Sequence, residues 1–249
     1  MIPEFKSHES YRHFACSAKA WRYNRSPDDE VFLDALIQTA ERKMEGIPVG
    51  SPVWRAQVGF KHLEGPHGCV EIPLDADRMK PPREWKIYGR AAEGRINPKG
   101  IPILYTSTTE AIAMHEVRPS PGQLVIVAEL RTCRDFRVLN VTVHESAIPN
   151  IVYFAEPSVP EREEAVWRDI DRAFSEPVER SDDHADYVGT QSISEVFRKR
   201  GLDGIAYRSA FGKGHNIAFF DLDAAQILSC QLYEVTDIHL SFSTRGNPK

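Results

Sequence analysis

Three residues of types that serve in catalysis, an arginine, a tyrosine and a glutamate, follow one another at short spacing in the segment 93–119. Arg95 enters a turn rich in glycine and proline, Tyr105 ends the strand-like run that follows, and Glu116 ends the next short helical run. The surrounding residues 78–99 hold seven bases against two acids, a net charge of +5. Such a basic stretch can favour an anionic ligand in a protein whose overall charge is −5.

Each of these residues also has an ordinary structural interpretation. Arg95 could form a salt bridge in a loop, Tyr105 could be a half-buried strand residue, and Glu116 could be a solvated helix end. The run 156–186, with eleven acids against four arginines, is typical of a solvated helical surface or, alternatively, of a face that binds a partner protein. Residue types alone leave these alternatives open.

Hydrophobic periodicity predicts the elements that must position these residues. Helices are expected at 27–44, 109–116, 160–174 and 185–200, and strands at 52–57, 101–105, 124–130, 137–141, 205–208, 216–220 and 227–233. Ser26 before Pro27 marks the first of these helix starts, and Trp167 is expected in a buried helix stripe. Helices and strands mix without regular alternation, which predicts an α+β fold with a mixed or largely antiparallel sheet.

Composition and missing motifs exclude several protein classes. The chain of 249 residues is 41% hydrophobic and 27% charged, which is typical of a globular protein. It has no apolar run of about 20 residues, and its start lacks the apolar core of a signal peptide, so we expect a soluble, cytoplasmic protein without a membrane partner. The four cysteines are widely spaced, so no metal site is expected. Phosphate-loop, dinucleotide-fingerprint, zincin and nucleophile-elbow motifs are absent, and a pI near 6.0 argues against nucleic-acid binding.

The motifs around the three residues resemble those of the RES domain family. Within the segment 94–119 the chain reads G-R-x-N-P-x-G-x-P-x-L-Y-T-S and then T-E-A-I-A-x-x-E-V-R-P. Further on, the stretches 204–209 and 216–220 resemble the serine-bearing strand of the family and the strand after it. The resemblance spans residues 53–228 and leaves out residues 1–50.

This resemblance implies an enzyme that consumes NAD. RES proteins are toxins, usually of bacterial toxin–antitoxin pairs, and their fold resembles that of the ADP-ribosyltransferases. They cleave the bond between nicotinamide and ribose, with water or inorganic phosphate as the acceptor. Carried over to this chain, the functional residues of the family fall on Arg55, Arg95, Tyr105, Glu116 and Ser209. Asn216 is a further candidate for the site, with a turn residue at a strand start as the equal alternative.

The resemblance gives each of these residues a role. Nicotinamide leaves as a neutral group, so one carboxylate suffices, and Glu116 would stabilise the positive charge that develops on the ribose. Arg95 and Arg55 would hold the pyrophosphate, and Tyr105 would stack on nicotinamide or on the ribose face. Ser209 would bind the nicotinamide end or orient the glutamate; a nucleophilic role is disfavoured because no histidine lies close by in the sequence.

Two neighbours of these residues carry separate expectations. Many RES proteins have an aromatic residue directly after the motif arginine, where it could pack on the nucleotide, whereas this chain has Ile96. His115 precedes the proposed glutamate in a helix, so its side chain is expected to point about 100° away and to be structural.

The sequence therefore predicts an ADP-ribosyltransferase-like α+β domain at 51–235, with a helical extension at 1–50 and a tail at 236–249. The implied substrate is NAD without metal or further cofactor, and the implied partner is a separate helix-turn-helix antitoxin of the Xre type. Whether the chain forms a homo-oligomer is open. Two alternatives remain: an ADP-ribosyltransferase that modifies a protein or nucleic acid, and a non-catalytic binding module. Such transferases often carry Gln or Glu two residues before the glutamate, and Met114 at that position favours degradation.

Overall fold

The computed structural model describes residues 3–21, 24–65, 68–72, 79–81, 91–143, 157–176 and 184–239. The helices of this part of the chain are α1 (Ser10–Ala20), α2 (Pro27–Ala40), α4 (Glu110–Glu116), α5 (Val159–Ser175) and α6 (Val188–Lys199). The strands are β1 (Met44–Ile47), β2 (Pro52–Val58), β3 (Lys61–Gly65), β4 (Gly68–Ile72), β5 (Leu104–Ser107), β6 (Leu124–Thr132), β7 (Phe136–Asn140), β8 (Gly204–Arg208), β9 (His215–Phe219) and β10 (Ala225–Glu234).

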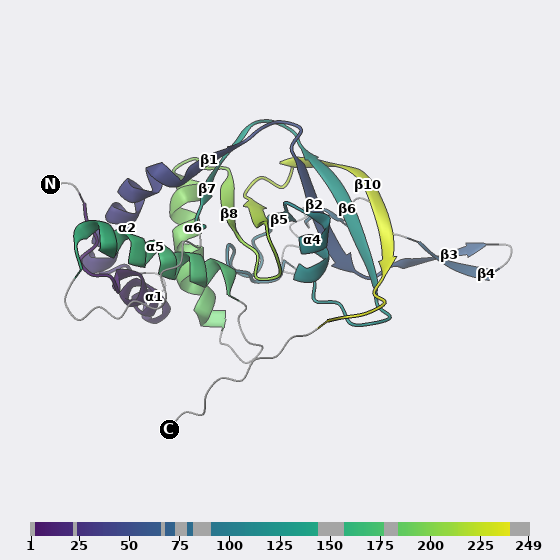
Figure 1. Cartoon of the computed structure of the whole chain (residues 1–249), viewed down its shortest axis with the longest axis horizontal. Coiled ribbons are helices and arrows are strands. Elements are labelled where there is room, and N and C mark those ends of the chain that lie inside the picture. The colour runs from purple at the N-terminus through teal and green to yellow at the C-terminus, as the bar shows by residue number, and fades with distance from the viewer. Residues whose placement is uncertain are drawn as a thin grey trace, which may run out of the picture.

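An eight-stranded sheet with the order β1-β7-β8-β9-β5-β2-β6-β10 forms the centre of the molecule. Strands β7 and β8 run parallel, and the other neighbouring strands run antiparallel. Helices α1, α2, α5 and α6 gather at one end of the sheet, and the β3–β4 hairpin projects from the other end (Figure 1). The predicted α+β class with a mixed sheet is confirmed.

The sheet is weakly joined at its middle. Strand β2 pairs with β6 over seven residues, whereas it shares a single residue pair with β5, between Trp54 and Ser107. The short helix α4 packs against β2 at this place (Figure 1). The two halves of the sheet therefore diverge beside the helix that ends in Glu116.

The four gathered helices share one hydrophobic core with the sheet. Its buried side chains include Phe14 and Leu36 from the N-terminal helices together with Trp167, Phe174 and Phe197 from α5 and α6. The predicted burial of Trp167 is confirmed, and its Nε1 donates a hydrogen bond to the Thr39 Oγ1 at 3.1 Å. Helices α1 and α2 thus pack on α5 and α6 in a common core.

None of the helices among the described residues is long and apolar enough to cross a membrane.

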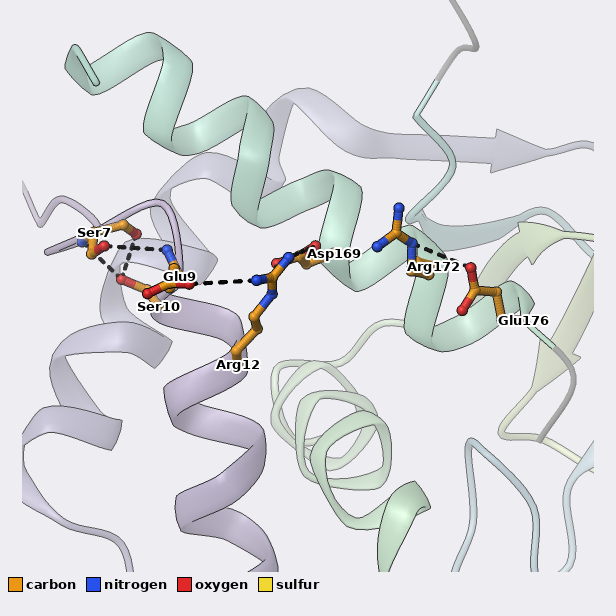
Figure 2. Close-up of polar contacts among 7 residues, drawn as sticks. All are labelled: Ser7, Glu9, Ser10, Arg12, Asp169, Arg172 and Glu176. Carbon is orange, nitrogen blue, oxygen red and sulfur yellow. Dashed lines mark hydrogen bonds and ion pairs between the residues drawn. The ribbon is translucent and has the colours of Figure 1, made fainter. Parts of the chain in front are cut away.

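A salt bridge ties α1 to α5 at the surface of this core. Arg12 of α1 lies between Glu9 and Asp169, and its Nε is 2.9 Å from the Asp169 carboxylate (Figure 2). At the C-terminal end of the same helix α5, Arg172 pairs with Glu176 at 3.2 Å (Figure 2). Helix α5 is therefore tied to α1 at Asp169 and carries its own ion pair at its last turn.

The start of α2 follows its sequence signals, and its end does not. Ser26 and Asp29 form a reciprocal capping box, with Pro27 at the first helical position. The helix was expected to continue to residue 44, but it ends at Ala40, and Met44–Ile47 forms edge strand β1 against β7. Pairing with a distant strand overrides the local helical pattern here. The strand has only four residues, two of them exposed, so its sequence shows little of the alternation between apolar and polar residues that would predict a strand.

Three further expectations differ from the structure or fall outside it. Strand β5 begins at Leu104 instead of residue 101, so Tyr105 lies near its start and not at its end. The β3–β4 hairpin was not predicted. Much of the basic stretch 78–99 (82–90 in particular) and most of the expected tail (240–249) lie outside the described residues.

Candidate active site

A cavity of about 170 Å³ is lined by four of the six predicted site residues, Arg95, Tyr105, Glu116 and Asn216. The rest of its lining comes from Gly94, Arg118, Ser175, Tyr187, Tyr207, Ala210 and Phe211. Ser209 is bound to Glu116 directly, and Arg55 lies behind Tyr105, so neither is among the lining residues. The structure therefore brings together residues from four separate parts of the chain.

The carboxylate of Glu116 is positioned by two buried donors. Thr109 caps α4 by accepting a hydrogen bond from the Ile112 amide at 3.3 Å, and Glu116 is the last residue of this helix. Ser209 Oγ donates to Glu116 Oε1 at 2.9 Å, and Asn216 Nδ2 donates to the same oxygen at 2.5 Å. Both donors converge on one oxygen, and the residue as a whole is exposed, so a ligand can reach the carboxylate.

The two donors come from the strand pair β8–β9 and its connecting loop. Asn216 lies on β9 beside β5 and accepts a hydrogen bond from Ser107 Oγ at 2.7 Å, which fixes its amide orientation. Ser209 follows β8, and its loop returns through Gly214, whose φ of 150° favours glycine. A Cβ at Gly214 would lie 2.5 Å from the Ile112 side chain of α4. Any other residue at this position would therefore strain the backbone and displace the side chains of Ile112 and Thr108, so glycine lets the loop approach the helix of the glutamate.

Tyr105 is held by the turn that carries Arg95. Its hydroxyl donates to Asn97 Oδ1 at 2.7 Å and accepts from the Ile96 amide at 3.3 Å. A Cβ at Gly94 would lie 2.7 Å from this hydroxyl, which explains the glycine of the motif. Burial raises the pKa of Tyr105 well above its usual range, so the phenol stays neutral at physiological pH.

A second buried phenol lies beside the carboxylate. The pKa of Tyr207 is also raised, first by burial and then by the negative charge of Glu116. Tyr207 packs against Phe174 of α5, with ring centroids 6.2 Å apart. The cavity therefore combines these two neutral phenols with the carboxylate of Glu116 and two arginines, Arg95 and Arg118.

Arg95 binds the end of α5. Its two terminal nitrogens donate to the backbone carbonyls of Phe174 and Glu176. These carbonyls belong to the last turn of the helix, where the backbone carries partial negative charge, so a cation is favourable there. The contact ties the motif turn to the helix that also contacts α1.

Arg55 bridges the weak junction between β2 and β5. Its guanidinium donates to the Tyr105 carbonyl at 2.9 Å. Tyr105 has no partner residue in the short pairing between β5 and β2, so this side chain makes the contact between the two strands there. Its Nε is buried without a hydrogen-bond partner among the described residues. Burial lowers the pKa of Arg55 to about 10, so the side chain remains positive at neutral pH. Arg55 thus places a charge behind the site.

The expectations about Ile96 and His115 resolve differently. Ile96 is buried in the main core and borders a separate cavity of about 700 Å³ beside α6, so a side chain at this position does not reach the Glu116 cavity. The contact between an aromatic residue at this position and the nucleotide therefore stays an expectation of the resemblance, and in this chain the position forms part of the core and of the wall of the 700 Å³ cavity. His115 contacts the Ala111 carbonyl through Nδ1 at 2.6 Å, and its ring faces Phe211. It is not among the residues that line the Glu116 cavity.

Sequence reasoning did not select several residues that build the site. Asn97 anchors Tyr105, and Gln191 of α6 donates to the carbonyls of Gly94 and Asn97 at 2.9 and 3.1 Å. Arg118 lines the cavity two residues after the glutamate. The motif letters N-P-x-G and E-V-R-P contained a signal for Asn97 and Arg118, whereas nothing local marked Gln191.

Comparison with known proteins supports the resemblance of these motifs to a family. A comparison with curated proteins found no match. A crystal structure of the M. tuberculosis MbcT–MbcA toxin–antitoxin complex matches with a TM-score of 0.42 and 17% identity, over 81% of this chain and 92% of that chain. The family model of the RES domain matches residues 66–243, which is well over half of the chain. The chain therefore belongs to the RES domain family.

Proposed function

We propose that this protein cleaves the bond between nicotinamide and ribose in NAD and so depletes the cofactor. The observation that carries the proposal is the carboxylate of Glu116, which Ser209 and Asn216 hold at a cavity shared with Arg95 and Tyr105. Positive charge develops on the ribose as this bond breaks. A carboxylate that is already oriented stabilises that charge without reorganisation.

The chemistry needs few groups. The bond between C1′ of the ribose and the pyridinium nitrogen breaks, and its electron pair returns to the ring, so nicotinamide leaves neutral without a general acid. Water then adds to the same carbon and loses a proton, which gives ADP-ribose; inorganic phosphate as the acceptor bonds to this carbon through an oxygen and gives the corresponding ribose 1-phosphate of ADP-ribose. One carboxylate suffices, whereas ordinary glycosidases use two. We expect neither a metal nor a second cofactor to take part.

The contacts of the other residues support specific roles. Ser209 directs its hydroxyl proton to Glu116, which supports orientation of the carboxylate and not nucleophilic attack. The hydroxyl of Tyr105 is engaged by Asn97, so its ring is the part that can stack on nicotinamide or ribose. Arg95 spends two N–H groups on the end of α5, and its remaining donors are available to the pyrophosphate. Arg55 adds positive charge behind Tyr105.

The test is incubation of the purified protein with NAD, with and without phosphate, while nicotinamide and the ribosyl product are quantified. We expect Glu116→Gln to lower the rate by about 10²–10³-fold, as for loss of other prepositioned stabilising groups. Glu64→Gln on the exposed β3 strand is the matched control and should retain the wild-type rate. The product identifies water or phosphate as the acceptor. Nicotinamide release that is unchanged in Glu116→Gln would refute the proposed role of the carboxylate.

Family membership supports the further proposal that the protein acts in the cytoplasm as a toxin opposed by a helix-turn-helix antitoxin. Expression of the wild type should arrest growth as cellular NAD falls, and Glu116→Gln should do neither. Labelled NAD added to lysate tests the alternative, an ADP-ribosyltransferase, which would leave persistent label on a macromolecule. Growth arrest by both variants would instead favour a binding module.

A further inference from the structure

A second cavity adjoins the one that holds Glu116. It measures about 590 Å³ and is lined by the end of α4, by Val125 of β6 and by the segment 233–239 that follows β10. The two cavities share Arg118 and Phe211 in their linings. At the end of α4, consecutive residues therefore serve different cavities: Glu116 lines the smaller one and His115 lines the larger one.

The sizes of the two cavities differ in a way that bears on the substrate. Binding sites for small molecules usually measure about 300–1,000 Å³. The cavity of Glu116, at about 170 Å³, is smaller than this range, so it has room for only part of a dinucleotide. The adjoining cavity, at about 590 Å³, lies within the range. A dinucleotide cleaved at Glu116 must extend beyond the first cavity, and the second lies directly beside it, with Arg118 and Phe211 lining both.

Arg118 stands between the two cavities in an unusual backbone conformation. Its φ is 46°, the only positive value at a non-glycine position among the described residues. It follows the helix C-cap Val117, where glycine is the usual residue because side chains strain the left-handed conformation. The presence of an arginine in this strained conformation, where glycine would relieve the strain, points to a function of the arginine side chain.

The guanidinium of Arg118 is available for a ligand. The residue is exposed, and its side chain makes no hydrogen bond or ion pair within the described part of the chain. It lies 5.7 Å from the ring centroid of Phe211, and the His115 ring lies nearly parallel to that ring, with centroids 6.5 Å apart. Aromatic rings of this kind offer faces on which a nucleic-acid base can stack.

The larger cavity combines apolar walls with carboxylates. Met114, Val125 and Val235 supply apolar surface, while Glu234 and Asp237 supply oxygen acceptors. In other dinucleotide sites an acidic side chain binds the ribose hydroxyls. These features match the three parts of an adenosine phosphate. The apolar wall suits the base, the carboxylates can accept hydrogen bonds from the ribose hydroxyls, and Arg118 suits the phosphate.

We propose that the larger cavity binds the adenosine half of the dinucleotide and that Arg118, at the junction, binds the pyrophosphate. The inference rests on the proposed function, since it assigns the remainder of the same substrate. Arg95 engages the end of α5 with two N–H groups and offers its remaining donors to the pyrophosphate, and Arg118 adds further donors from the junction.

The binding experiment is calorimetric titration of AMP and ADP-ribose into the full chain. Arg118→Ala should weaken both affinities by about ten- to hundredfold, because a charge-assisted hydrogen bond to phosphate is lost. Arg118→Gly should weaken them equally while it preserves or raises the melting temperature, because glycine relieves the backbone strain. Thr236→Trp, in an exposed part of the rim, should block AMP by filling the cavity. Arg137→Ala, at an exposed position of β7, is the matched control and should bind as the wild type does.

A kinetic experiment separates this inference from the proposed function. In Arg118→Ala, the preference for NAD over nicotinamide riboside, which lacks phosphate and adenosine, should fall by about ten- to hundredfold. AMP affinity that is unaltered in Arg118→Ala or in Thr236→Trp would overturn the inference, as would the absence of AMP and ADP-ribose binding to the wild type. Binding that depends on Arg118 without any nicotinamide release would retain the subsite and refute the glycosidic activity instead.

Discussion

At the scale of single residues, the site depends on groups whose own contacts fix them in one orientation. Asn216 accepts from Ser107 through its carbonyl oxygen, which turns its amide toward Glu116. Tyr105 is fixed in the same manner by Asn97. A carboxylate held by two donors loses little mobility when a substrate binds, and that preorganisation is the main source of electrostatic catalysis.

The amide of Asn216 is therefore expected to matter for rate more than for folding. Asn216→Ala removes a hydrogen bond to a charged group, worth about 1.5–3 kcal/mol, so nicotinamide release should slow by about ten- to hundredfold. Steady-state kinetics and a thermal melt measure both effects. Asn140→Ala is the control, because Asn140 donates to the Glu45 carboxylate at 2.7 Å on the exposed edge of the sheet. Equal rates in the two variants would contradict the role given to Asn216.

At the scale of elements, α5 connects the N-terminal helices to the site. Asp169 pairs with Arg12 of α1 (Figure 2), and Trp167 contacts α2. The carbonyls at the end of the same helix accept from Arg95. The residues before the region matched by the family model therefore help to place a motif residue. Helices α1 and α2 contribute several fully buried side chains to the common core, so they support the helix that Arg95 contacts.

Leu36→Ala tests this dependence. Leu36 of α2 is fully buried, so its truncation should lower the free energy of unfolding of the whole chain by about 2–5 kcal/mol. Val31→Ala on the exposed side of the same helix should change it by about 0.5 kcal/mol or less. Urea denaturation followed by circular dichroism gives both values. A main unfolding transition that Leu36→Ala leaves in place would show that α2 is an independent appendage.

At the scale of the whole molecule, buried tyrosines make the fold sensitive to alkali. Burial raises the pKa of Tyr11, Tyr105 and Tyr207 above the usual value near 10. The unfolded chain releases these protons at lower pH than the folded chain does. The stabilising contribution of each tyrosine is thus complete below pH 10 and is lost as the pH rises above it.

Above about pH 10 the free energy of unfolding should fall by about 1.4 kcal/mol per pH unit for each such tyrosine. Tyr105→Phe should reduce the slope of the free energy of unfolding against pH by the contribution of one tyrosine, about 1.4 kcal/mol per pH unit, whatever its effect on stability at neutral pH. Tyr207→Phe should reduce it by the same amount. Urea unfolding at several values between about pH 9 and pH 11 provides the slopes. Parallel curves for the wild type and both variants would contradict the burial of these phenols.

The extent to which sequence predicts this structure depends on how local each feature is. The capping box at Ser26 and the cap of α4 at Thr109 are formed by neighbours within three residues, and the sequence predicts a helix start at each of these places. The partners of Arg95 lie 79 and 81 residues away at the end of α5, and no local pattern marks them. The burial of Ile96 likewise depends on packing against distant helices.

The spacing between Glu116 and its two donors has a consequence for the time during which the chain is synthesised. Ser209 and Asn216 follow the glutamate by 93 and 100 residues, and β5 cannot pair with β9 until that late segment exists. At translation rates of 5–20 residues per second, roughly 5–20 s pass between synthesis of the carboxylate and synthesis of its donors. The ribosome-bound chain therefore carries an incomplete site until the segment 209–216 has been synthesised, and the carboxylate has neither of its two donors before then.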